Sequence, residues 1–157
     1  MDDAGLRLRW NRGVGEANES ISGLFLFKIV DAGLIEFQPG MDGVMAQAGY
    51  MNPGATGPEL AVKQAEIRLV FKDNSGYYIS AAKTFTSGAG IYFNALSESY
   101  RRYNPSQASI EAINTFGDPA QPSFKGISLA GFYLKAVRGS DLQSGTNIGV
   151  TQFTVRA

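Results

Sequence analysis

Residues 65–86 hold the pattern that most constrains this fold, a hairpin signal that reads AEIRLVFKDNSGYYISAAKTFT. Its first half alternates apolar residues with mostly charged ones, which is the period of two that a half-buried strand requires. The apolar residues that share one face are Ile67, Leu69 and Phe71. Residues 73–76, Asp-Asn-Ser-Gly, tolerate a tight turn and positive φ. We therefore expect an antiparallel hairpin in which the odd-numbered apolar residues and one of Tyr77 and Tyr78 face the core.

Similar short apolar or alternating segments recur along the chain, separated by turn residues. We expect further strands at 6–10, 23–30, 34–37, 44–51, 91–93, 127–137 and 149–156, with loops at 11–20, 52–58, 117–122 and 138–147. Residues 95–102 are ambiguous, and residues 23–30 read as buried on both faces. No helix longer than two turns, no helix–strand alternation and no repeat is evident. The prediction is all-β: one antiparallel β-sandwich over residues 1–157, of jelly-roll type first and immunoglobulin-like second, with the first and last strands adjacent.

Composition excludes several classes of function. The 157 residues include no Cys and no His, so disulfides, thiolate metal sites, a Ser-His-Asp hydrolase and a His-ligated zinc enzyme are ruled out. The net charge is zero, which gives no basic footprint for nucleic acid and no anchor for an anionic membrane. The apolar run at 24–30 contains Lys28 and is too short to span a bilayer. No signal peptide is visible, and we expect Met1 to be a start added to an excised module.

Six segments together resemble a known family. They are LRLRWNRGVG at 6–15, SISGLFLFK at 20–28, IRLVFKDNSGYYIS at 67–80, YRRYNP at 100–105, SLAGFYLKAV at 128–137 and GVTQFTV at 149–155. In order and spacing they resemble the galactose-binding-like jelly-roll modules that accompany secreted bacterial polysaccharide-degrading enzymes such as agarases. The resemblance implies a non-catalytic carbohydrate-binding module outside the cell, tethered to a catalytic domain. Its ligand would be a polysaccharide or oligosaccharide, for example agarose or a sulfated relative.

The best local candidate for ligand binding is the segment 100–103. Two cations flanked by two phenols, Tyr100, Arg101, Arg102 and Tyr103, are unusual in a chain with only 18% charged residues, and they suit an anionic or sulfated glycan. If the segment is a strand, however, Arg101 and Arg102 point to opposite faces and cannot both reach one ligand. The alternative interpretation is one buried tyrosine with both arginines in solvent.

Further candidates lie near the first strand and the loop at 52–58. Trp10 could stack on a sugar ring, although its alternation with Leu6 and Leu8 favours a core position. Asn11 and Arg12 follow it in a glycine-containing loop, where they could bind sugar hydroxyls or simply be solvated. Tyr50 lies beside the second loop, where a position on the rim of a site is plausible.

The remaining chemistry is limited. No pair of carboxylates has a recognisable glycosidase context, so we expect no enzyme activity. A structural Ca²⁺ bound by loop oxygens is the one metal we consider, with Asp141 and Asn147 in the last loop as its ligands, or Asp31 and Asp42 instead. Two alternatives to glycan binding stay open: a structural or adhesive surface domain without a glycan ligand, and a small jelly-roll lyase or hydrolase that uses Tyr with Arg or Lys.

Overall fold

The computed structural model of the chain describes residues 6–10, 18–26, 35–36, 43–50, 62–85, 89–104, 116–123, 127–139 and 146–156. These residues contain eleven strands, all paired antiparallel, and no helix. The strands are β1 (Leu6–Trp10), β2 (Ser20–Leu26), β3 (Ile35–Glu36), β4 (Gly43–Tyr50), β5 (Val62–Asp73), β6 (Gly76–Ser80), β7 (Lys83–Phe85), β8 (Ala89–Asn94), β9 (Tyr100–Tyr103), β10 (Ser128–Arg138) and β11 (Thr146–Arg156). The all-β prediction is therefore confirmed for this part of the chain.

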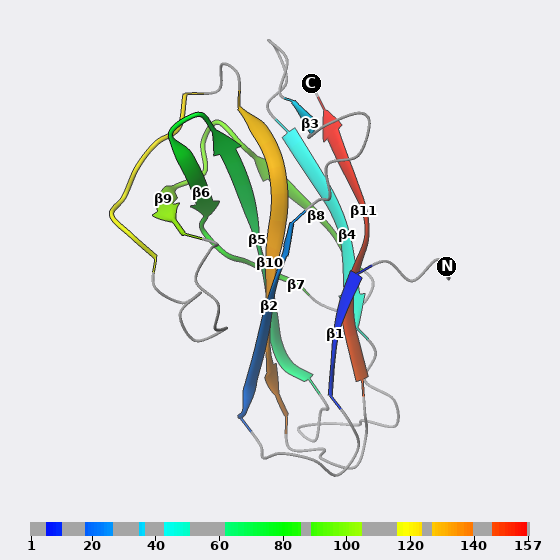
Figure 1. Cartoon of the computed structure of the whole chain (residues 1–157). Coiled ribbons are helices and arrows are strands. Elements are labelled where there is room, and N and C mark those ends of the chain that lie inside the picture. The colour runs from blue at the N-terminus through cyan, green and yellow to red at the C-terminus, as the bar shows by residue number, and fades with distance from the viewer. Residues whose placement is uncertain are drawn as a thin grey trace.

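The strands form two sheets (Figure 1). One sheet has four strands in the order β1-β11-β4-β8, and the other has the path β2-β10-β5-β6-β9, with β3 paired to β10 and β7 paired to β5. The first strand pairs with the last, as predicted, because Leu6 lies opposite Val150 and Trp10 opposite Thr146. In Figure 1 the group β2, β5 and β10 and the group β1, β4 and β11 both run roughly along the long axis of the molecule.

Strands β5 and β6 form the predicted hairpin. Phe71 lies opposite Tyr78, and Asp73 lies opposite Gly76. The turn depends on two local features. The Asp73 carboxylate accepts a hydrogen bond from the Ser75 backbone N–H at 2.8 Å, and Gly76 takes a φ of 132°, which a residue with a side chain rarely adopts. The Asp-Asn-Ser-Gly turn is thus confirmed, and the strand before it is longer than predicted because β5 begins at Val62.

The main core lies on one face of the seven-stranded sheet and includes residues of the other sheet. Ile67, Leu69 and Phe71 of β5 are fully buried, as predicted, and Tyr78 is the tyrosine of the pair that joins them. Other members are Phe85, Tyr100, Ile127, Leu129, Phe132, Leu134 and, from β8, Ile91 and Phe93. Since β8 belongs to the four-stranded sheet, one apolar cluster connects the two sheets.

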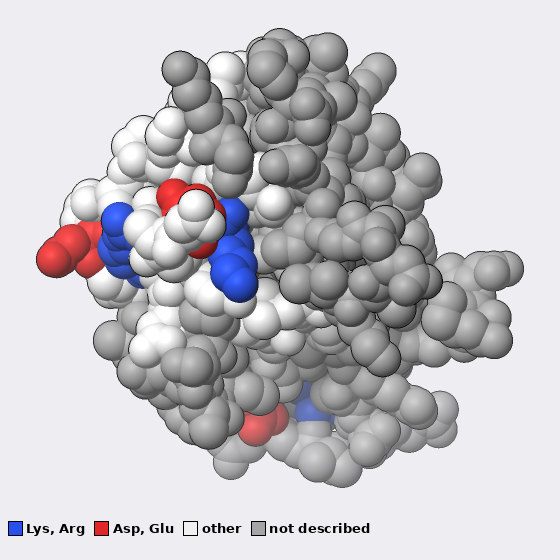
Figure 2. All heavy atoms as spheres, turned by 45° about the horizontal axis from the view of Figure 1, so that its top comes forward, with Lys and Arg blue, Asp and Glu red and all other residues white. Residues whose placement is uncertain are grey.

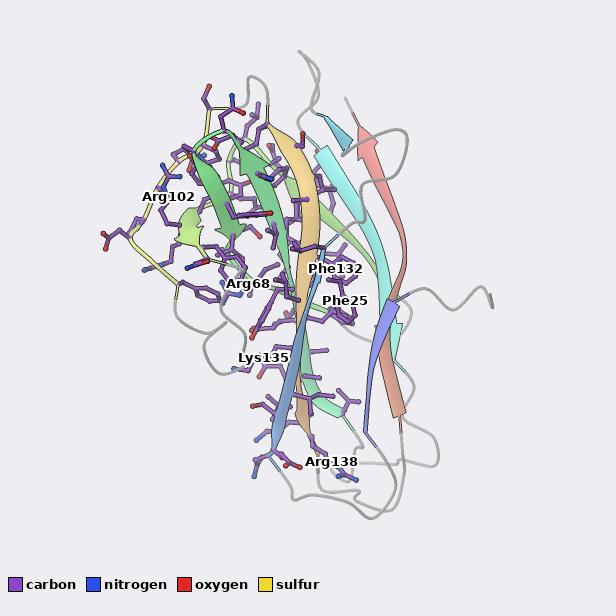
Figure 3. All side chains as sticks on the ribbon, in the orientation of Figure 1. Phe25, Arg68, Arg102, Phe132, Lys135 and Arg138 are labelled. Carbon is purple, nitrogen blue, oxygen red and sulfur yellow. The ribbon has the colours of Figure 1, made fainter. Side chains whose placement is uncertain are left out.

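A second, smaller cluster covers the opposite face of the seven-stranded sheet. We call it the outer cluster, and its buried members are Val70, Ile79, Tyr103, Ala130 and Tyr133. Phe116 packs on it from outside the strands, with its ring centroid 5.8 Å from that of Tyr103 and 6.2 Å from that of Tyr133. Arg68 places its guanidinium 4.7 Å from the Phe116 ring centroid. Figure 3 shows Arg68 on the opposite side of the sheet from Phe25 and Phe132, which stack at 5.0 Å.

Several sequence expectations need correction. The strand expected at 23–30 to be buried on both faces is β2, which lies at the end of its sheet and leaves Leu26 42% exposed. The ambiguous segment 95–102 divides into turn residues after β8 and the strand β9. The loop expected at 138–147 was predicted too long at both ends, because Arg138 still belongs to β10 and Asn147 already belongs to β11.

Candidate functional site

The segment 100–103 forms β9, so its four side chains alternate between faces. Ser80 lies opposite Tyr100 and Tyr78 opposite Arg102, whereas Ile79 lies opposite Arg101. Tyr100 and Arg102 therefore lie on the core side of the sheet, and Arg101 and Tyr103 on the side of the outer cluster. As the strand geometry predicted, the two arginines do not converge on one point.

Both tyrosines of this segment are buried. Tyr100 is 3% exposed and its hydroxyl donates a 2.6 Å hydrogen bond to the carbonyl oxygen of Ala95. Tyr103 is 6% exposed and packs against Phe116. Burial raises the pKa of both phenols, with a further contribution from Glu98 at Tyr100 and from Tyr133 at Tyr103. Neither ring is available as a stacking surface in this conformation, so the arginines are the exposed half of the predicted cluster.

Arg102 joins a set of polar groups at the β5–β6 turn that we call the turn network: Asp73, Ser75, Tyr78 and Arg102. Its guanidinium lies 4.4 Å from the centroid of the Tyr78 ring, and its Nη1 donates a 3.1 Å hydrogen bond to Ser75 Oγ. The Ser75 hydroxyl donates at 2.7 Å to Asp73 Oδ1. Tyr78 Oη lies 3.1 Å from Ser75 Oγ, and the Tyr78 hydroxyl also hydrogen-bonds to the Asp73 carboxylate.

The charge state of the turn network follows from these contacts. Burial alone raises the pKa of Asp73, but hydrogen bonds from the Ser75 side chain and backbone, then Tyr78 and the charge of Arg102, outweigh it and lower the pKa below its ordinary value. Asp73 is therefore a carboxylate at neutral pH, beside a permanently charged guanidinium. Figure 2 shows acidic and basic side chains next to one another on the face turned toward the viewer, among described residues that are uncharged.

This arrangement can bind a polar ligand without chemistry. An arginine normally loses rotamer freedom when it binds, which weakens the interaction. The Tyr78 ring and Ser75 restrict Arg102 before any ligand arrives, and most of its N–H groups remain available. Sequence reasoning missed Asp73 and Ser75 as site residues. The sequence signal that could have identified them is a polar turn followed directly by an aromatic residue, Tyr78, in the next strand.

The remaining predicted site residues divide into two groups. Asn11, Arg12 and Asp141 lie outside the described residues. Trp10 and Tyr50 are described as strand backbone: Trp10 is opposite Thr146, and Tyr50 is opposite Ile148. Following the ladder across β11, β4 and β8, the register positions of Trp10 and Tyr50 fall on the same sheet face as Ile91, a member of the main core.

One of the two predicted Ca²⁺ ligands, Asn147, does not lie in the loop where it was expected. Asn147 is not a loop residue but pairs with Arg9 in the β1–β11 ladder. Across the residues whose side chains are described, no group of three or more acidic side chains could hold a metal ion. The partners of Asp73 are Ser75, Tyr78 and Arg102, and none of them is a second carboxylate.

An exposed aromatic residue lies on the other sheet. Tyr92 of β8 is 46% exposed and covers Gly43 of β4, where an added Cβ would lie 2.7 Å from both Cε2 and the hydroxyl oxygen of the ring. Among the described side chains, it is the single aromatic residue with this degree of exposure. It therefore offers the surface for stacking that Tyr100 and Tyr103 do not.

The part of the chain described here contains no helix that could span a bilayer. Comparisons with known protein families, with curated proteins and with solved structures find no match for this chain.

Proposed function

We propose that the chain is a jelly-roll β-sandwich that binds a polysaccharide without catalysis. The strand order supports the jelly roll. Leaving aside β3, β7 and β9, eight strands divide equally between two sheets, ordered β1-β11-β4-β8 and β2-β10-β5-β6. The first two strands thereby pair with the last two, β1 with β11 and β2 with β10, as in a ribbon of paired strands rolled into a barrel. The core cluster shared by β8 with β5 and β10 supports face-to-face packing of the sheets.

One observation carries the binding function, the position of Arg102. Its guanidinium contacts the Tyr78 ring and Ser75, lies near the Asp73 carboxylate, and keeps N–H groups available for a ligand. Planar charged groups of this kind make directional hydrogen bonds to sugar hydroxyls. Tyr92 supplies an exposed ring for stacking on the opposite sheet. On this proposal the protein works outside the cell and brings an attached catalytic domain to its polysaccharide, and any Ca²⁺ is structural.

The direct test is retention of the purified protein on gels containing agarose, carrageenan, ulvan, alginate, xylan or cellulose, with and without Ca²⁺. We expect retention on at least one gel, and about tenfold weaker retention for Arg102→Ala, because a charged hydrogen bond is lost. Arg101→Ala is the matched control, since Arg101 lies on the other face of the same strand and donates to the Gly117 carbonyl oxygen. A folded protein that none of these gels retains contradicts glycan binding.

A structural or adhesive domain is the second candidate, and one observation favours it. The described side chains include no row of exposed aromatic residues, because Tyr92 stands alone among them. The same gels separate the two functions, together with Tyr92→Ala, which removes the exposed ring. An assay for reducing ends and unsaturated products on the same polysaccharides tests the proposed absence of catalysis.

A further inference from the structure

We infer that the turn network selects a neutral glycan with adjacent free hydroxyls over a sulfated one. The inference rests on the proposed function and specifies the class of ligand at the same site. It differs from the simplest interpretation of two neighbouring arginines, which is an anion site. Three features of the site carry it: the number of cations it presents, the carboxylate beside them, and the hydrogen-bonding capacity that both charged groups retain.

The site presents one cation to a ligand. Arg101 lies on the opposite face of β9, and its Nη1 donates to the Gly117 carbonyl oxygen at 3.3 Å. Lys72 is opposite Tyr77 on the same far face and places its ammonium 5.3 Å from the centroid of that ring. Among the described residues, Arg102 is therefore the cation of the turn network.

Asp73 offsets that cation. Arg102 Nη1 and Asp73 Oδ1 each contact the same atom, Ser75 Oγ, so a positive and a negative group lie one hydroxyl apart. The hydrogen bonds of Asp73 lower its pKa, so the carboxylate is charged at neutral pH. A sulfate ester approaching Arg102 meets this fixed negative charge, and its oxygens cannot donate a hydrogen bond to the carboxylate.

Adjacent sugar hydroxyls fit the same pair of groups. A hydroxyl both accepts and donates, so one can accept from Arg102 while its neighbour donates to Asp73. The capacity for this is present. Arg102 uses one of its five N–H groups on Ser75, and the hydrogen bonds from Ser75 N and Oγ to the Asp73 carboxylate both end on Oδ1. Tyr78 also hydrogen-bonds to this carboxylate, and of its roughly four lone-pair sites one stays available to a sugar hydroxyl.

The test compares neutral agarose with sulfated carrageenan, two galactans that differ in charge, by affinity electrophoresis of the whole chain. We expect the unmodified protein to prefer agarose. Asp73→Asn keeps an oxygen that can accept from Ser75 but removes the negative charge, so retention on agarose should fall about tenfold while retention on carrageenan rises. Arg102→Ala should weaken binding to both, and Arg101→Ala should weaken neither.

The outcomes separate this inference from the function on which it rests. A protein that binds carrageenan at least as tightly as agarose overturns the selectivity and leaves glycan binding intact. The same holds if Asp73→Asn leaves the ratio of the two affinities unchanged. A folded protein that binds no polysaccharide overturns both proposals. Circular dichroism and a thermal melt of each variant exclude unfolding as the cause of a lost affinity.

Discussion

Tyr100 and Tyr103 stand at the two ends of β9, point to opposite faces of the sheet, and are both buried, but only the hydroxyl of Tyr100 has a hydrogen-bond partner among the described residues. Tyr100 donates to Ala95 at 2.6 Å. The Tyr103 ring packs in the outer cluster against Phe116, and its buried hydroxyl has no partner among the described residues. The same chemical group therefore contributes differently to stability at two positions three residues apart.

Removing each hydroxyl should have opposite consequences. Tyr100→Phe loses a buried hydrogen bond and leaves the Ala95 carbonyl oxygen unsatisfied, which should lower the free energy of unfolding by about 0.5–1.5 kcal/mol. Tyr103→Phe removes a buried polar atom with no partner, so the free energy of unfolding should stay the same or rise by up to about 1 kcal/mol. Urea denaturation of both variants measures the difference. A loss at Tyr103→Phe as large as that at Tyr100→Phe would contradict this assignment and indicate a bound water at Tyr103.

Gly131→Ala should be strongly destabilising. At this position β10 passes so close to β2 that an added Cβ would collide with the Phe25 carbonyl oxygen and lie 2.9 Å from Leu26 Cα, and backbone atoms cannot rotate away. We expect the free energy of unfolding to fall by about 1–3 kcal/mol, as for other overpacked sites. Lys135→Ala, in the same ladder opposite Ser22, is the control and should change it by less than about 0.5 kcal/mol. Equal effects of the two substitutions would refute the close approach.

Ser80 should stabilise the sheet at the point where the pairing of β5 changes from β6 to β7. Its Oγ accepts from the Leu69 N–H at 2.8 Å and donates to the Ala81 carbonyl oxygen at 3.0 Å. Ser80→Ala leaves the buried Leu69 N–H without an acceptor, so the free energy of unfolding should fall by about 1–3 kcal/mol. Hydrogen exchange at the Leu69 amide should accelerate as well. Ser97→Ala removes an exposed 3.4 Å contact and should have little effect on either measurement.

The lowered pKa of Asp73 predicts a specific dependence of stability on pH. Because the folded state holds the carboxylate more readily than the unfolded chain does, Asp73 stabilises the fold above its unfolded pKa of about 4, and this contribution is lost as the pH falls through the lower folded value. The stability difference between the unmodified protein and Asp73→Asn should be constant from pH 7 to 5 and shrink below about pH 4. Urea denaturation at pH 7, 5, 4 and 3 measures it. A difference that persists undiminished at pH 3 would be inconsistent with the turn network.

The hairpin and the alternation of β5 could be predicted because they are local. Periodicity identified Ile67, Leu69 and Phe71 as core residues, and the turn composition identified residues 73–76. The same rule of alternation separated Arg101 from Arg102 before the structure did. These features depend on neighbours a few residues apart, which a single sequence contains.

The turn network could not be predicted in the same way. Arg102 and Ser75 are 27 residues apart, and their contact depends on β9 pairing with β6 in a register that brings Arg102 opposite Tyr78. The burial of Tyr103 depends likewise on Phe116, which comes from a segment outside the strands. The composition of segment 100–103 could be singled out from the sequence, but the partners of Arg102 come from elsewhere in the fold.

The side of β9 that faces away from β6 has a consequence for assembly. The segment around Asp118 runs along it and joins its backbone through Arg102 N to Asp118 O, Gly117 N to Arg102 O and Ala120 N to Tyr100 O. Strands at a sheet margin are where one polypeptide can recruit another by continuing the ladder, the route to swapped dimers and fibrils. Here these hydrogen-bonding groups of β9 are already paired within the chain itself, so this margin resists templated growth by a second copy.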